Sequence, residues 1–77
     1  MTTQEIISRA QAPKRGDKFV SPKSGATVKV MFVGDGKVGY RASFGGVNEW
    51  LSMPIEDWHR IARSTIEAGA TAKFADA

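Results

Sequence analysis

The stretch "VGDGKVGYRASFGG", residues 33–46, decides the fold, because it places two tight turns around one short alternating segment. Asp35-Gly36 is a strong two-residue hairpin pattern, since both positions accept a positive φ. Apolar and polar or small side chains alternate over residues 38–42, which is the period of a β-strand. The glycine pair at 45–46 predicts a second turn. The stretch therefore predicts one strand of an antiparallel sheet, with a turn at each end.

Strands are also predicted before this hairpin. "KFVSP", residues 18–22, is typical of a short first strand. "TVKVMFVG", residues 27–34, alternates so that Val28, Val30 and Phe32 share one side. The turn "KSGA" between these two strands contains a glycine that is expected to take a positive φ.

A fourth strand is predicted at "VNEWLSM", residues 47–53. Leu51 and Met53 share one face of this strand, and Trp50 points to the opposite face. Glu49 falls on the apolar face, which predicts either a bulge or an edge position.

The last clear element is a helix over residues 54–69, opened by a proline. Its apolar side chains fall within an arc of about 140° at 3.6 residues per turn. These are Ile55, Trp58, Ile61, Ala62 and Ile66. Residues 1–15 are expected to be a mobile arm, or a short helix if Ile6 and Ile7 find a docking site. Residues 70–77 are expected to be a frayed tail, unless Phe74 folds back.

The elements together predict a mainly β fold of the α+β class. Short strands on tight turns favour a small SH3-like antiparallel β-barrel of four to five strands over residues 16–53, because closing a sheet removes its exposed edges. The C-terminal α-helix would pack over one open end of the barrel. A flat meander with the helix across one face is the alternative. A chain of 77 residues is expected to form one small domain.

Composition argues against several classes of function. The chain has no cysteine and one histidine, so no disulfide, metal site or cofactor is predicted. His59 has no evident nucleophile beside it, and a chain this short rarely encloses a catalytic pocket. No apolar run reaches the roughly 20 residues that a membrane span needs. The first ten residues lack the pattern of a signal peptide, and a non-enzymatic protein of the cytoplasm is expected.

Three segments carry a resemblance to known proteins. "RGDKFVSPKSGATVKV", "GKVGYRAS" and "MPIEDWHRI" occur in the order found in the SH3-like chain of plasmid-encoded type II dihydrofolate reductases, over roughly residues 16–61. The catalytic Val-Gln-Ile-Tyr strand of that family is replaced here by Trp50-Leu51-Ser52-Met53. The resemblance therefore implies the fold but no reductase site, and no turnover of folate is expected.

The same pattern also resembles short proteins encoded by phages and prophages. Those proteins open with a Gly-Asp strand, continue through a Val-rich hairpin with a Tyr-Arg strand, and close on a helix that contains an aromatic residue. This resemblance implies a phage or mobile-element protein that binds a host or phage complex in the host cytoplasm.

Charge is distributed unevenly along the chain. Residues 1–41 contain eight Lys or Arg against three acids, which gives +5, and residues 42–77 contain three against five, which gives −2. Such asymmetry indicates a surface that attracts phosphates or an acidic protein, although solvated lysines on strand exteriors would give the same count.

Trp50 is the first candidate for binding, because strand parity places it outside a barrel near two cations. A tryptophan beside arginine is typical of a protein-binding surface. The predicted protein-binding residues are Trp50, Arg41, Phe44 and Lys29. Trp50 would instead be ordinary core if the N-terminal arm or the helix covered it, and Phe44 is either an exposed anchor or a plug at one barrel end.

The second hypothesis is sequence-tolerant binding of DNA or RNA. Its candidate residues are basic and lie in the first half of the chain: Lys14, Arg15, Lys18, Lys23, Lys29, Lys37 and Arg41. The leading prediction is thus a monomeric or small homo-oligomeric module that docks on a host or phage protein, with nucleic-acid binding as the alternative and no membrane partner.

Overall fold

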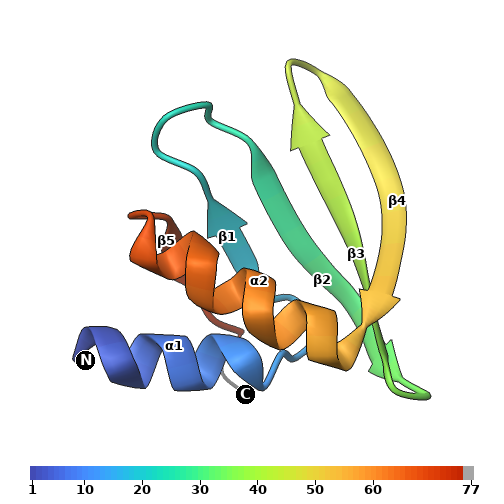
Figure 1. The fold of residues 1–77 in the computed structure, drawn as a ribbon. Coiled ribbons are helices and arrows are strands. Elements are labelled where there is room, and N and C mark those ends of the chain that lie inside the picture. The colour runs from blue at the N-terminus through green and yellow to red at the C-terminus, as the bar shows by residue number, and fades with distance from the viewer. Residues whose placement is uncertain (76–77) are drawn as a thin grey trace.

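A computed structural model describes residues 1–75 of the chain (Figure 1). Two helices and five strands follow one another along the sequence. In chain order they are α1 (Thr3–Gln11), β1 (Lys18–Val20), β2 (Thr27–Gly34), β3 (Lys37–Phe44), β4 (Val47–Pro54), α2 (Ile55–Glu67) and β5 (Thr71–Lys73). The mainly β, α+β class that the sequence predicts is confirmed. No helix within residues 1–75 is long and apolar enough to cross a membrane.

The strands form one antiparallel sheet in the order β4-β3-β2-β1-β5. Both predicted hairpins are present. Asp35 and Gly36 have φ values of 54° and 71° in the β2–β3 turn, and Gly45 and Gly46 have 58° and 83° in the β3–β4 turn. Positive φ at both central residues matches the right-handed twist of the strands that flank the turn, which explains why these four residues set the register.

The structure shows a sheet with two edges, and it does not show the closed barrel predicted from the sequence. β4 and β5 stand at opposite ends of the strand order, and no ladder joins them in the described chain. In Figure 1 the β3–β4 hairpin curves away from β1 and β5. The edge position predicted from Glu49 is confirmed, because β4 is an edge strand. The irregularity lies in β2, between Val30 and Phe32.

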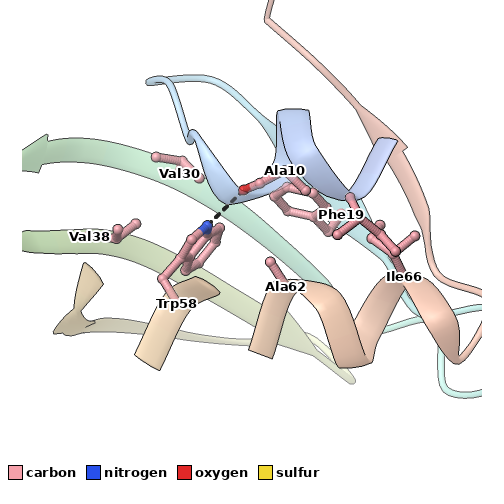
Figure 2. Packing of buried hydrophobic residues seen from close by; sticks show 8 residues of the cluster. Ala10, Phe19, Val30, Val38, Trp58, Ala62 and Ile66 are labelled. Carbon is pink, nitrogen blue, oxygen red and sulfur yellow. Dashed lines mark hydrogen bonds between the residues drawn. The ribbon is translucent and has the colours of Figure 1, made fainter. Parts of the chain in front are cut away.

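Both helices lie on one side of the sheet, called here the inner face (Figure 1). The core forms between them and the strands. Its buried residues are Ile7, Ala10, Phe19, Val30, Val38, Trp58, Ala62 and Ile66. Trp58 is central, because its ring lies 5.8 Å from that of Phe19 and its Nε1 donates to the carbonyl of Ala10 at 2.9 Å (Figure 2). Trp58 thus joins α2 to α1 and to the sheet.

The N-terminal segment forms a helix, the second of the two states predicted for it. Thr2 and Glu5 make a capping box, in which each side chain accepts a hydrogen bond from the backbone N–H of the other. An isolated helix of nine residues is marginal in water. Docking supplies the missing stability, because Ile7 and Ala10 are 2% and 0% exposed against α2 and the sheet.

In the described part of the C-terminal segment the structure shows the alternative prediction, in which Phe74 folds back, and not a frayed tail. Thr71–Lys73 form β5 and pair with β1, whose second edge would otherwise stay open. The Phe74 ring packs edge-on to Phe19, with centroids 6.1 Å apart. Residues 76–77 of the predicted tail lie outside the described residues.

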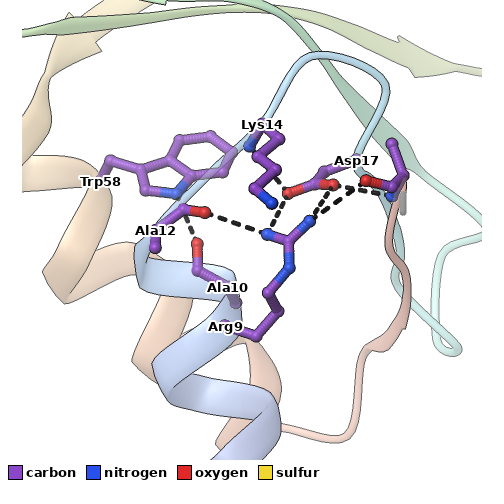
Figure 3. Close-up of polar contacts among 7 residues, drawn as sticks. Arg9, Ala10, Ala12, Lys14, Asp17 and Trp58 are labelled. Carbon is purple, nitrogen blue, oxygen red and sulfur yellow. Dashed lines mark hydrogen bonds and ion pairs between the residues drawn. The ribbon is translucent and has the colours of Figure 1, made fainter. Parts of the chain in front are cut away.

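A buried ion pair holds the two ends of the chain together (Figure 3). Asp17 is fully buried and accepts hydrogen bonds from both terminal nitrogens of Arg9, at 2.9 and 3.0 Å. Its remaining acceptor positions take the backbone N–H groups of Lys14 and Ala75. Arg9 also covers the ring of Phe74, 4.6 Å from its centroid. This Arg9–Asp17 pair therefore fixes α1, the start of β1 and the chain after β5.

Candidate nucleic-acid interface

The outer face of the sheet carries one row of residues that crosses all five strands. Directly paired residues of an antiparallel sheet point to the same face, so the ladder register defines the row. Lys73 pairs with Lys18, Lys18 with Lys29, Lys29 with Arg41, and Arg41 with Trp50. Their sequence neighbours Phe19, Val28, Tyr40 and Ala72 belong to or pack against the core, so the row points away from the helices.

The four cations of this row, Lys73, Lys18, Lys29 and Arg41, are called the cationic row. Neighbouring strands lie about 4.8 Å apart, so the row with Trp50 at its end spans about 19 Å. Like charges directly opposite each other destabilise a sheet. The chain places three such pairs side by side, and the register sets no acid opposite any of the four. An anion laid along the row would relieve this repulsion.

The cationic row lines a groove of about 330 Å³ on the outer face. The hydroxyl-bearing Thr27 and Ser43 also line it, and no acid lines it within residues 1–75. Asp17 is adjacent in sequence to two lining residues, but it is buried and paired with Arg9. Asp76 follows the lining residue Ala75 in sequence and lies outside the described residues. Arg41 adds a further feature: its Nε is buried and has no hydrogen-bond acceptor within the described chain. A buried donor without a partner is costly, so Arg41 is held in its place at the expense of stability.

Two aromatic side chains stand at the Arg41 end of the row. Trp50 lies opposite Arg41 and is 66% exposed, so the prediction that it lies on the exterior is confirmed and the core alternative is wrong. Phe32 is 53% exposed and pairs with Gly39, which is two residues from Arg41 on β3. A Cβ atom at Gly39 would overlap the Phe32 ring, so this ring lies directly against the glycine.

The prediction from strand alternation that Phe32 shares a face with Val28 and Val30 is wrong. The register shift between Val30 and Phe32 adds a residue to β2 and turns Phe32 to the outer face. Gly39 was the available clue, because a glycine inside a strand often marks a bulge or a close approach. Lys73 was missed for another reason: it lies in the segment predicted to be a tail.

The structure brings some of the predicted binding residues together and separates others. Lys18, Lys29, Arg41 and Trp50 lie in one row, as the register shows. Phe44 does not join them, because the alternation of β3 places it on the inner face, where it pairs with Val47 and is 62% exposed. Phe44 is thus exposed, as one of its two predicted states requires, but it does not share a face with Trp50, Arg41 and Lys29. Its role in binding stays a prediction.

The remaining predicted cations lie outside the row. Lys14 and Arg15 are exposed in the segment between α1 and β1, and Lys23 is exposed in the loop before β2. Lys37 shares the outer face, but it lies four residues along β3 from Arg41, which is about 13 Å. The candidate interface thus contains three of the seven residues predicted for nucleic acid, with Lys73 as an addition.

A second hollow, of about 250 Å³, lies on the inner face between α2 and the sheet. Its lining is apolar apart from two hydroxyl-bearing residues: Phe19, Val28, Tyr40, Met53, Trp58, Ile61, Ala62 and Thr65. Its lining within the described part of the chain includes no carboxylate, histidine or cation. Within residues 1–75, no three acidic or histidine side chains are grouped closely enough to hold a metal ion.

Comparison with known proteins returns no match: no family model, no curated protein and no solved structure is significantly similar to this chain. The resemblance to phage-encoded and SH3-like proteins therefore stays a prediction.

Proposed function

We propose that this chain is a non-enzymatic, cytoplasmic module that binds single-stranded nucleic acid on the outer face of its sheet. The observation that carries the proposal is the cationic row, which ends at Trp50 and has no acid opposite it in the register. Phosphates of one strand would follow the row, and unpaired bases would stack on Trp50 and Phe32. Encoding by a phage or mobile element, and kinship with SH3-like barrels, remain part of this proposal.

The aromatic end of the row favours a single strand over a duplex. Bases are available for stacking only when they are unpaired, and each base stacked on an aromatic side chain contributes about 1–3 kcal/mol. Stacking accepts any base, because every base has a flat π-face. The four cations and Trp50 contribute no carboxylate or amide, so binding through the row is expected to tolerate many sequences.

Docking of an acidic protein on the same face is the competing function. Trp50 and Arg41 suit it, because both residue types are enriched in protein hot spots. The placement of Phe44 on the inner face leaves that surface without its second predicted aromatic anchor. We therefore favour nucleic acid, and the experiment below separates the two classes.

The test is fluorescence anisotropy with labelled oligo-dT, oligo-U and a duplex of the same length, at several salt concentrations. Single strands are expected to bind more tightly than the duplex. If all four cations contact phosphates, log Kd should change with log salt with a slope of about 3 in magnitude, from 0.7 per phosphate on single strands.

Matched variants make the test specific to the row. Lys29→Ala and Trp50→Ala are expected to weaken binding at least several-fold, whereas Lys23→Ala removes the same charge from a loop outside the row and should change it little. Equal effects of Lys29→Ala and Lys23→Ala would show that net charge, not this row, attracts the nucleic acid. Absence of binding to single strands at low salt would overturn the proposal. Docking of an acidic protein would then be the favoured function of this face.

A further inference from the structure

The two edges of the sheet differ in length and charge. β5 forms one edge, is three residues long, and places Lys73 beside Lys18. β4 forms the other edge, is eight residues long, and has no strand of the described chain on its outer side. Short, charged edges resist the addition of another strand, and long unpaired ones invite it. β4 is therefore the edge at which this sheet can be extended.

The direction of the free backbone groups follows from the β3–β4 hairpin. Phe44 and Val47 pair across a two-residue turn, and residues in this position exchange both hydrogen bonds. Hydrogen-bonded and non-hydrogen-bonded pairs then alternate along the ladder. The N–H groups of Asn48, Trp50 and Ser52 consequently point away from β3, toward the open edge.

The side chains of β4 also lack the usual protection of an edge strand. Val47, Leu51 and Trp50 are 62%, 43% and 66% exposed, and together they put apolar surface on both faces of one edge. β4 contains no Lys or Arg, and its single charge is Glu49. Lysine and proline within the strand are the common devices that keep edges from pairing, and here a proline stands only at the last position.

We propose that β4 pairs antiparallel with β4 of a second copy, so that two five-stranded sheets join into one around a two-fold axis. Antiparallel self-pairing matches a strand with itself, and the same surface serves both partners. With the axis beside Leu51, Glu49 of each copy lies opposite Met53 of the other, so the two carboxylates do not face each other. Leu51 meets Leu51 across the axis on the inner face.

The β5 edge explains why the assembly stops at two copies. A third copy would have to pair with a three-residue strand that carries Lys73 at its end. The joined sheet would also bring the Trp50 ends of both outer rows together, which gives one continuous outer face. This inference does not depend on what that face binds.

Sedimentation equilibrium of the full chain, over a wide range of protein concentrations, tests the proposal. The expected mass at high concentration is twice 8.3 kDa. A monomer at every concentration would overturn the proposal and would leave the β4 edge to a strand of another protein. Ser52→Pro removes one outward N–H without removing a donor to β3, so it should shift the equilibrium to monomer, while Ser52→Ala should remain dimeric.

Amide hydrogen exchange of the wild-type chain tests the same proposal even if the Ser52→Pro variant does not fold. In the wild-type dimer the amides of Asn48, Trp50 and Ser52 should become protected as concentration rises, while those of Glu49, Leu51 and Met53 are protected by β3 throughout. Dimers in which the first set still exchanges freely would place the contact elsewhere and overturn the proposal. A folded Ser52→Pro variant that remains fully dimeric would do the same.

Discussion

Asp17 and Lys18 are neighbours in sequence, yet the charge of Asp17 is buried and paired, whereas the charge of Lys18 is exposed beside other cations. Asp17 is fully buried, and every hydrogen bond it accepts comes from Arg9 or a backbone N–H. Lys18 is exposed between two other lysines of the outer face, and the register gives it no acid. Loss of one partner from a buried pair leaves an uncompensated charge and is costly, whereas a row of exposed like charges costs stability while it is intact.

The largest expected effect comes from breaking the buried pair. Asp17→Asn keeps the size of the side chain but leaves the Arg9 guanidinium, 17% exposed, without its counter-charge. Removal of one partner from a buried pair typically costs about 3–5 kcal/mol, and urea unfolding should show a loss near the lower end of that range. Asp35→Asn is the matched control: it makes the same change at an exposed turn and should alter stability little. A loss equal to that of the control would mean that the pair does not organise the chain ends.

The same contrast explains which features could be predicted from sequence. The strands, their turns and the row of Lys29, Arg41 and Trp50 follow from period-two alternation locked by two glycine-containing turns. The face of Phe32 could not be predicted from alternation alone, because the bulge in β2 reverses it and the only clue, Gly39, lies on the neighbouring strand. The Arg9–Asp17 pair could not be predicted either, since its partners lie in different elements and no periodicity connects them.

Short elements at the chain ends were harder to predict for an energetic reason. α1 and β5 have nine and three residues, too few for local propensity to decide. Both depend on tertiary contacts, through Ile7 in one case and the β1 ladder in the other. Closure of the sheet was predicted from the need to remove edges, but no strand within residues 1–75 pairs with the outer side of β4.

A smaller effect, of opposite sign, is expected in the cationic row. Lys29→Gln removes the charge that faces both Lys18 and Arg41, so it should raise the free energy of unfolding by about 0.5 kcal/mol at low salt. Added salt should erase the gain, because exposed charges are screened. Thermal unfolding at two ionic strengths measures both changes.

Lys37→Gln is the control for this prediction. Lys37 points to the same face but lies opposite Gly34 and Pro54, so it has no cation across either ladder. Its substitution should leave stability unchanged. If the two variants behave alike, cross-strand repulsion is not what distinguishes the row.

The smallest effect concerns Glu5, whose carboxylate is hydrogen-bonded at the start of α1 but fully exposed. The backbone N–H of Thr2, and next its side chain, hydrogen-bond to Glu5 and lower the pKa of that carboxyl, and slight desolvation opposes them. Because the pKa is lower in the folded state, the contribution of Glu5 is present above its unfolded-state pKa and is lost as pH falls through the folded value. The first turn of α1 should therefore fray in acid before the core unfolds, since Ile7 and Ala10 hold the rest of the helix.

NMR amide shifts of residues 2–5 measure this fraying, and Glu5→Gln should remove the transition while leaving the amides of the Arg9–Asp17 pair unchanged. A transition that persists in Glu5→Gln would assign the acid sensitivity to another carboxyl. The exposed Glu5 would then have no measurable effect on the helix, in contrast to the large effect expected for the buried Asp17.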